Sequence, residues 1–262
     1  MLSECPQCSS GIIKYYGMGT QRVEEEFIRE FPSARASRMD SDVLSRKNAH
    51  IDIIESFTRG EIDVLIGTQM IAKGLNIANV TLVGVLMSDS LFNIPDYRAS
   101  ERGFQLLTQV AGRAGRGDFN GIVYFQTHTP EFYALQFAKE QDYLSFYSSE
   151  IQSRYEFSYP PYSQLTRLIL SSENQIRTEK MANETAFRLK NITEREGISE
   201  KLEVLGPTPC IISKIEDEFR FQILIKNRLE QKGATIVSSF LRELKIPEDI
   251  KFLVDVDPVE ML

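Results

Sequence analysis

The stretch IDVLIGTQMIAKG (residues 62–74) joins a run of β-branched and other apolar residues to a loop of small and polar ones. Its first part, residues 62–66, is typical of a buried parallel strand. In an open parallel sheet, ligands bind at the carboxyl ends of the strands, where hydroxyl, amide and backbone N–H groups can hold phosphate oxygens. The stretch therefore predicts an α/β fold with a phosphate-contacting loop, whose candidate residues are Gly67, Thr68, Gln69, Lys73 and Gly74.

The sequence on both sides of this stretch alternates short apolar runs with helical patterns, which is typical of a parallel sheet covered by helices. Asp89 follows one of the expected strands, so it is either a relay for the nucleotide state or a turn or helix cap. We expect strands over residues 11–16, 34–39, 62–66, 80–86 and 121–126, and helices over residues 20–31, 46–57, 98–111 and 131–155.

A second, smaller domain is expected after Tyr159-Pro160-Pro161-Tyr162, because two prolines cannot continue a helix. The expected divisions are a short N-terminal segment (1–10), an α/β lobe (11–157) and an α+β domain (158–262). The pattern of the last part predicts a split βαβ sandwich. Its expected strands cover residues 165–170, 202–205, 210–215, 219–225 and 251–256, and its helices residues 175–195 and 230–244.

The helix expected over residues 98–111 ends in a second motif, QVAGRAGR (residues 109–116). Arg113 and Arg116 are three positions apart, so they project from one face of a helical turn. Two guanidinium groups placed in this way suit a polyphosphate. Alternatively, the arginines only complement the helix dipole and the glycines end the helix. The motif by itself leaves both interpretations open.

Composition limits the classes of function. The formal net charge is -7 and the pI is near 5.1, so a contact with DNA must be local rather than spread over a basic surface. No stretch approaches the ~20 consecutive apolar residues of a membrane span. Residues 1–5 lack the basic and apolar regions of a signal peptide. We therefore expect a cytoplasmic protein with no membrane partner.

Cys5 and Cys8 have the spacing of half a zinc ribbon or knuckle. A structural zinc ion needs four ligands, and the remaining cysteine, Cys210, lies far along the chain on a core-strand pattern. We expect that the other two ligands precede this sequence in a longer protein. The alternative is a redox pair or two ordinary thiols.

The motifs GTQMIAKG and QVAGRAGR resemble motifs V and VI of superfamily 2 helicases, and their wording is similar to that of the replication-restart helicases of that superfamily. The resemblance covers nearly the whole chain, through GMGT (17–20), DYRASER (96–102), YPPY (159–162) and DVDP (255–258). It implies a RecA-like helicase lobe and a cytoplasmic 3′-to-5′ DNA helicase driven by ATP and Mg²⁺. The implied partners are forked and single-stranded DNA, the single-stranded-DNA-binding protein and other primosome proteins.

The resemblance also implies roles for individual residues. Arg116 would be the arginine finger on an ATP held by the other motor lobe, with Arg113 beside it and Gln109 near the nucleotide. Such a finger stabilises charge on the transferring phosphoryl group and is worth on the order of 10³ to 10⁵ in rate. The remaining implied residues are Thr68, Gln69 and Lys73, which would couple nucleotide state to the DNA backbone, and Cys5 and Cys8, which would be the last two zinc ligands.

Two departures from the family pattern matter. The sequence contains no G-x-x-x-x-G-K-[ST] phosphate loop and no acidic magnesium-binding box, so we expect no ATP hydrolysis by this chain alone. Gln21 also stands where the family usually has a glutamate.

Five further residues are candidates for contacts with DNA: Gly19, Thr20, Arg98, Arg102 and Tyr162. A helix N-terminus can bind a phosphate and an exposed tyrosine can stack on a base. Each candidate has an ordinary alternative. The glycine can simply form a turn, the arginines can pair with acidic neighbours on a solvated helix face, and the tyrosine can pack at a domain junction.

Two other classes of function remain open. The chain could be a docking module for DNA or an acidic protein segment, for which the candidate basic residues are Lys214, Arg220, Lys226, Arg228 and Lys232. It could also be a nucleotide-binding regulatory protein that shares the lobe fold without unwinding DNA.

Overall fold

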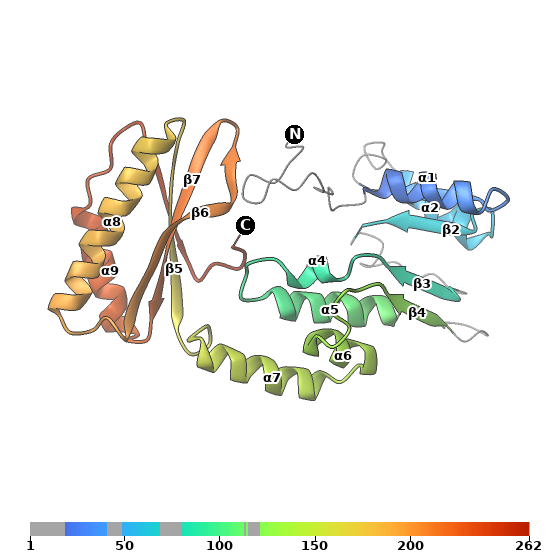
Figure 1. The fold of residues 1–262 in the computed structure, drawn as a ribbon, viewed down its shortest axis with the longest axis horizontal. Coiled ribbons are helices and arrows are strands. Elements are labelled where there is room, and N and C mark those ends of the chain that lie inside the picture. The colour runs from blue at the N-terminus through green and yellow to red at the C-terminus, as the bar shows by residue number, and fades with distance from the viewer. Residues whose placement is uncertain (1–18, 41–48, 69–79, 113, 115–120, 262) are drawn as a thin grey trace, which may run out of the picture. The chain divides into compact units, whose positions relative to one another are not determined.

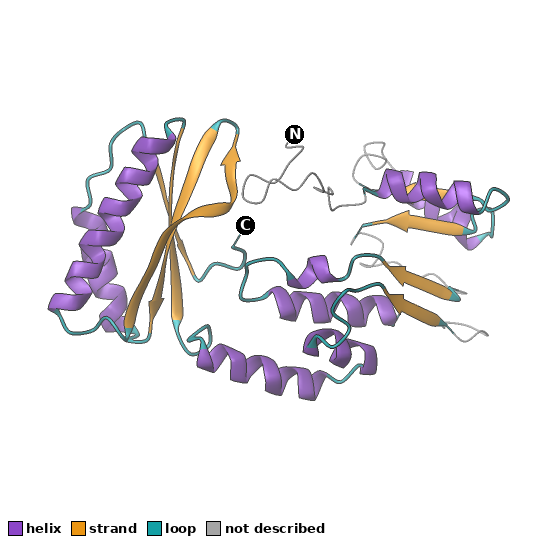
Figure 2. Ribbon diagram, in the orientation of Figure 1, coloured by secondary structure: helices purple, strands orange, loops and turns teal. Residues whose placement is uncertain are grey.

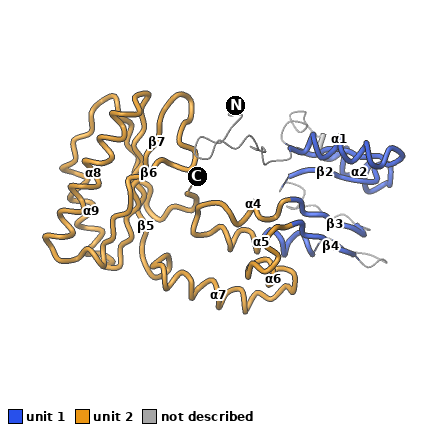
Figure 3. The backbone as a smooth tube through the Cα atoms, in the orientation of Figure 1, with its two compact units in different colours: residues 1–86, 106–126 blue, residues 87–105, 127–262 orange. Residues whose placement is uncertain are grey.

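The structure is a computed structural model that describes residues 19–40, 49–68, 80–112, 114 and 121–261. The chain divides into two compact units, which Figure 3 colours separately. Unit 1 comprises Met1–Leu86 and Leu106–Gln126, and unit 2 comprises Met87–Gln105 and Thr127–Leu262. The division crosses helix α5 (Ala99–Ala111), so this helix contributes residues to both units.

Unit 1 contains two pairs of parallel strands, and Figure 2 draws the strands of the chain in orange. Strand β1 (Ala36–Met39) pairs with β2 (Val64–Gly67), and β3 (Leu82–Val85) pairs with β4 (Ile122–Phe125). Parallel neighbours need a crossover connection, and helix α2 (Ala49–Thr58) lies between β1 and β2 in the sequence. The parallel pairs confirm the expected α/β class. The unit also contains α1 (Thr20–Glu30) and the C-terminal part of α5.

Unit 2 is built on a four-stranded antiparallel sheet with the strand order β6-β7-β5-β8. The elements follow one another as β5, α8, β6, β7, α9 and β8, so the expected split βαβ type is confirmed. Figure 1 shows α8 and α9 on one face of the sheet. The bounds are β5 (Gln164–Ser172), α8 (Gln175–Arg195), β6 (Leu202–Ile215), β7 (Glu218–Asn227), α9 (Gln231–Glu243) and β8 (Lys251–Val256).

The core of this α+β domain lies between the sheet and its two helices. Asn174 caps α8 by accepting a hydrogen bond from the Arg177 N–H, and Gly197 follows the helix in the left-handed conformation (φ 64°) that favours glycine. The apolar side of α8 then packs on alternate strand residues. The buried core includes Leu168, Leu170, Ala182, Ala186, Leu189, Phe221, Ile223, Ile225, Val237 and Phe240.

Two sequence-based boundaries were wrong, and both errors have local causes. The single helix expected over residues 131–155 is α6 (Tyr133–Glu140) followed by α7 (Tyr143–Glu156). Gln141 adopts a left-handed conformation (φ 55°), and Asp142 begins α7 by accepting a hydrogen bond from the Ser145 N–H. The two strands expected over 202–205 and 210–215 form one long strand, β6, whose pairing with β7 shifts register on each side of Thr208.

A short helix, α4 (Asp89–Phe92), was not expected from the sequence. It packs against α5 at Gly103, where a Cβ atom would lie 2.3 Å from the Phe92 ring. Among the described residues, no helix is both long enough and apolar enough to cross a bilayer.

Candidate nucleotide-contacting and DNA-contacting sites

The carboxyl ends of β1 and β2 form one edge of unit 1. Met39 lies opposite Gly67 in the strand register, so Asp40 and Thr68 follow the two strands at the same edge. Thr68 is exposed and Asp40 is buried. The start of α1 reaches this edge too, because the Thr20 hydroxyl donates a 2.6 Å hydrogen bond to the Asp40 carboxylate. The structure therefore brings Gly67, Thr68 and Thr20, all candidates from the sequence, to one end of a parallel strand pair.

Asp40 is a residue of this edge that the sequence reasoning missed. Its Oδ2 atom accepts from Thr20 and lies 3.1 Å from Nε of Arg38, which also approaches Glu24 at 4.0 Å. The Thr20 hydroxyl is therefore engaged with a carboxylate. A phosphate at the start of α1 would meet backbone N–H groups instead, and Gly19 leaves room there because a Cβ atom would touch nothing within 4 Å. The signal that could have found Asp40 is its position directly after a strand.

Helix α5 carries the start of the second motif. Gln109 is exposed on this helix, and the helical bonding continues through the Gly112 N–H, which donates to the Thr108 carbonyl at 3.0 Å. The described residues thus continue the helical bonding as far as the residue before Arg113. Seven of the residues predicted for the sites lie outside the described part of the chain: Cys5, Cys8, Gln69, Lys73, Gly74, Arg113 and Arg116.

Asp89 lies in the first turn of α4 and connects it to the segment after β4. Its carboxylate accepts hydrogen bonds from the hydroxyls of Thr127 (2.8 Å) and Thr129 (2.7 Å) and from the His128 N–H (3.0 Å). Burial raises the pKa of this carboxyl group, but these hydrogen bonds outweigh burial and lower the pKa to about 2. Asp89 is therefore ionised at neutral pH and joins segments about 40 positions apart in the sequence.

Arg98 and Arg102 take part in ion pairs at the start of α5. Arg98 pairs with Glu101 at 3.3 Å, and Arg102 pairs with Asp96 at 3.0 Å. The Asp96 side chain is 0% exposed, so the interpretation of these pairs as a solvated helix face is wrong for Asp96. Glu101 also accepts a 2.8 Å bond from Arg154 of α7. Both arginines therefore form ion pairs that stabilise the start of α5.

A column of rings and cations lies beside these ion pairs. The Tyr97 and Tyr159 rings stack at 5.2 Å with an interplanar angle of 8°. Arg154 lies 5.3 Å from the Tyr97 ring centroid, and Nζ of Lys226 lies 3.9 Å from that of Tyr159. Tyr162, by contrast, is 42% exposed and makes an edge contact with Tyr155. Of the two YPPY tyrosines, Tyr159 packs within unit 2 and Tyr162 has a surface available for a base.

The column corrects one part of the expected basic patch. Lys226 is buried, its amine donates a 2.8 Å hydrogen bond to the Phe157 carbonyl, and burial lowers its pKa. It is not a surface residue of the patch, although Arg228 and Lys232 are exposed. Cys210 is 3% exposed, so its expected place in the core is confirmed.

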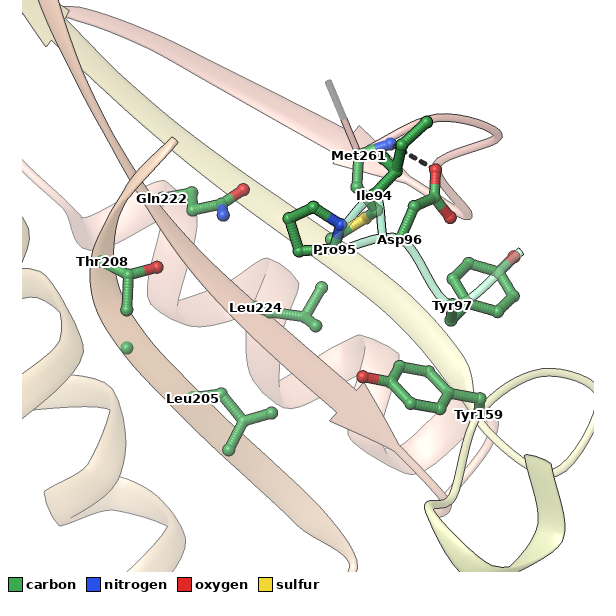
Figure 4. Close-up of a pocket in the computed structure, with 11 residues that line it drawn as sticks. Ile94, Pro95, Asp96, Tyr97, Tyr159, Leu205, Thr208, Gln222, Leu224 and Met261 are labelled. Atoms are coloured by element: carbon green, nitrogen blue, oxygen red, sulfur yellow. Dashed lines mark hydrogen bonds between the residues drawn. The ribbon is translucent and has the colours of Figure 1, made fainter. Parts of the chain in front are cut away.

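Unit 2 also contains a cavity of about 420 Å³ (Figure 4). Its floor is formed by β6 and β7 side chains such as Leu205 and Leu224, and its walls include Tyr159 and Asp96. Gly206 is required at its floor, since a Cβ atom there would lie 2.9 Å from the Gln222 carbonyl oxygen. None of the residues predicted for nucleotide contact lines this cavity.

The described residues fit some of the implied cofactors better than others. Exposed donors at a strand end, such as Thr68, and the exposed amide of Gln109 suit the oxygens of a polyphosphate. Magnesium needs carboxylates with open oxygens. The Asp89 carboxylate accepts several hydrogen bonds, and the Asp40 carboxylate accepts one from Thr20 and forms an ion pair with Arg38. Within the described ranges there is no group of three or more metal-ligating side chains. These residues therefore fit phosphate contact but do not fit a magnesium site.

Comparison with known proteins finds two matched domains in this chain, whose limits differ from those of the two compact units. Residues 12–118 match the helicase conserved C-terminal domain, and residues 155–259 match the primosomal protein N C-terminal domain. The fold and the motif pair thus define the C-terminal lobe of a helicase followed by a primosomal domain. The chain belongs to the family of replication restart proteins named PriA.

Three relatives illustrate the match. The Replication restart protein PriA of Bacillus subtilis is 42% identical, and the match covers 98% of this chain and 32% of that protein. The Replication restart protein PriA of Synechocystis is 41% identical, and the match covers 98% of this chain and 30% of that protein. The protein of the same name from Borreliella burgdorferi is 34% identical, and the match covers 99% of this chain and 38% of that protein. The chain thus spans about a third of the length of the curated relatives it matches.

Proposed function

We propose that this chain forms the second motor lobe and the C-terminal domain of an ATP-dependent 3′-to-5′ DNA helicase that remodels stalled replication forks and starts primosome assembly. The observation that carries the proposal is the tandem match of a helicase lobe and a primosomal domain over residues 12–118 and 155–259. The parallel strands of unit 1 support it, because they place Gly67 and Thr68 at a strand end, where α/β proteins bind phosphates.

In this proposal, the residues of the chain act on a nucleotide held by the other motor lobe. ATP supplies the phosphoryl group whose hydrolysis drives the motor. Arg116 presents a positive charge to that group, and Arg113 lies beside it. Gln109 donates a hydrogen bond from its side-chain amide to the nucleotide. Thr68, Gln69 and Lys73 hold the DNA backbone and link its position to the nucleotide state, and Gly67, Gly74 and Asp89 shape the loops around them.

The DNA contacts in this proposal are local, as the net charge of -7 requires. The N–H groups at Gly19 and Thr20 bind a backbone phosphate, Tyr162 stacks on an unpaired base, and the exposed parts of Arg98 and Arg102 contribute charge. We propose as partners forked and single-stranded DNA, the single-stranded-DNA-binding protein and other primosome proteins, and we propose that the complex acts in the cytoplasm.

The decisive experiment replaces Arg116 in the full-length protein that contains this chain. Arg116→Ala should lower DNA-stimulated ATP turnover by at least about 10³-fold, the scale of an arginine finger, while the affinity for forked DNA changes little. The matched control is Arg29→Ala, which removes an exposed arginine that forms a surface ion pair with its neighbour Glu30. Retained turnover in Arg116→Ala would remove this residue from catalysis and favour a docking module without motor activity.

We also propose that Cys5 and Cys8 contribute two of four ligands to a structural zinc ion. A pair of thiolates cannot close a tetrahedral site, so metal analysis of the 262-residue chain should find well under one tightly held zinc ion. The full-length protein should hold a full equivalent at these cysteines and lose it in Cys5→Ser. One tightly bound ion on the short chain would contradict the proposal.

A further inference from the structure

The turn before α5 meets the residues that follow β8 at the buried carboxylate of Asp96 (Figure 4). Oδ1 of Asp96 accepts a 2.9 Å hydrogen bond from the Arg98 N–H. Oδ2 accepts from Nη1 of Arg102 at 3.0 Å and from the Met261 N–H at 3.2 Å. Arg102 also donates to the carbonyl of Val259. One carboxylate therefore ties the first turn of α5 to a segment 165 positions away in the sequence.

Burial makes this arrangement specific. A buried charge that loses a partner is left uncompensated, which costs far more than losing the same pair at the surface. The Arg177–Asp249 pair has the same 3.0 Å separation but lies on the surface, where its side chains are 55% and 45% exposed. The Asp96 side chain is 0% exposed. The position of the turn before α5 is therefore set by the three donors around Asp96 together.

The column of rings and cations supplies a second connection, between the turn before α5 and the α+β domain. Tyr97, directly after Asp96, stacks on Tyr159. The amine of Lys226, a residue of β7, makes a cation–π contact with the Tyr159 ring. Glu101 in the first turn of α5 accepts a 2.8 Å bond from Arg154 of α7. Beside the hydrogen bonds of Asp96, the start of α5 therefore has further contacts with the α+β domain through Tyr97 and with α7 through Glu101.

We propose that Asp96 is a positioning residue through which the C-terminal α+β domain sets the position of α5. The helix has 13 residues, so it extends ~20 Å from this anchor to Gln109 and the residue before Arg113. Movement of the C-terminal domain is transmitted along the helix to the end that carries the nucleotide-contacting motif. This role of Asp96 rests on the proposed motor function, and it makes the C-terminal domain a control element for ATP turnover.

The test uses two variants that break the anchor in different ways. Asp96→Asn removes the charge and turns one acceptor into a donor, whereas Met261→Pro removes the N–H that bonds Asp96 and leaves the Asp96 carboxylate itself unchanged. Their matched controls are Asp249→Asn, which breaks an exposed pair at the same distance, and Met261→Leu, which keeps the N–H. Met261→Pro changes a residue after the last strand, so it keeps the test decisive if Asp96→Asn fails to fold.

Hydrogen exchange of the 262-residue chain gives the first readout. Both anchor variants should lower the protection of residues 98–105 by roughly tenfold or more, the effect of losing a hydrogen bond to a buried charge, while α8 keeps its protection. Neither control should change residues 98–105. Unchanged protection of this segment in both anchor variants would overturn the role of Asp96, whether or not the protein is a helicase.

ATP turnover of the full-length protein gives the second readout. The ratio of DNA-stimulated to DNA-free turnover should fall at least fivefold in both anchor variants, with the KM for ATP unchanged. An equal fall of both rates, or an unchanged ratio, would overturn the control role and leave Asp96 a purely structural residue. Absence of ATP turnover in the unmodified full-length protein would instead defeat the proposed motor function, and the exchange result would still decide whether Asp96 anchors α5.

Discussion

The two units differ in how their strands bury apolar side chains. In unit 2, Leu168, Leu170 and Ile223 are fully buried between the antiparallel sheet and its helices. In unit 1, Leu82, Ile122 and Tyr124 of the β3–β4 pair are 60%, 54% and 64% exposed. Parallel strands are normally covered on both faces. The difference teaches that the α+β domain holds its own core, whereas the β3–β4 pair keeps apolar surface that further packing could cover.

The largest effect is therefore expected from the core of unit 2. Leu189→Ala removes a fully buried side chain of α8 and should destabilise the domain by about 2–5 kcal/mol, because it combines lost burial with a cavity. The control is Phe187→Ala on the same helix, whose side chain is 65% exposed. Hydrogen exchange of β5 and β7 would measure the difference. Equal effects of the two variants would contradict a self-contained core.

An intermediate effect is expected at two glycines of different units, Gly103 within α5 and Gly112 directly after it. Gly103→Ala in unit 2 forces a Cβ atom to 2.3 Å from the Phe92 ring and should cost about 1–3 kcal/mol through overpacking. Gly112→Ala in unit 1 meets nothing closer than 3.5 Å and has no left-handed backbone, so it should be neutral or stabilising by up to about 1 kcal/mol. Thermal unfolding measures the stability of both variants. A larger loss of stability in Gly112→Ala than in Gly103→Ala would contradict this prediction.

The smallest effect is expected from acid at Asp89. Its pKa in the folded protein is about 2, below the ordinary value of 3.8. A depressed pKa means that the ionised carboxylate stabilises the fold fully above pH ~4, and that this contribution is lost as pH falls through the folded value. The difference in Tm between the unmodified chain and Asp89→Asn should therefore shrink between pH 4 and pH 2. A constant difference over that range would show that Asp89 is not ionised in the fold.

Local patterns in the sequence predicted most elements because they depend on neighbouring residues. The helix α8 and the strand β8 have the predicted bounds, since periodicity and capping specify them locally. The break between α6 and α7 was missed because Gln141 takes a left-handed conformation that no glycine announces. The continuity of β6 was missed for a related reason, because Gly206 and Pro207 suggest a break where the paired strand β7 keeps the chain extended.

The candidate site was predictable only where it lies within a motif. Thr68 and Gln109 stand in continuous stretches typical of phosphate contact, so the sequence alone was enough to propose them as candidates. Asp40 was missed because its importance depends on the Thr20 hydroxyl, which a fold must bring to it across 20 positions. Lys226 was wrongly assigned to a surface patch, because its charge gives no indication that the Tyr159 ring and the Phe157 carbonyl enclose it.

The sequence by itself determined most of the elements, the α/β and α+β classes of the two parts and the motifs that mark a helicase lobe. These properties follow from side-chain periodicity, turn chemistry and residues adjacent in the chain. Only the tertiary structure decided that Asp96 joins α5 to Met261 and that Tyr97 stacks on Tyr159. The physical reason is that a buried carboxylate and a stacked ring take their meaning from partners that folding brings together from distant positions.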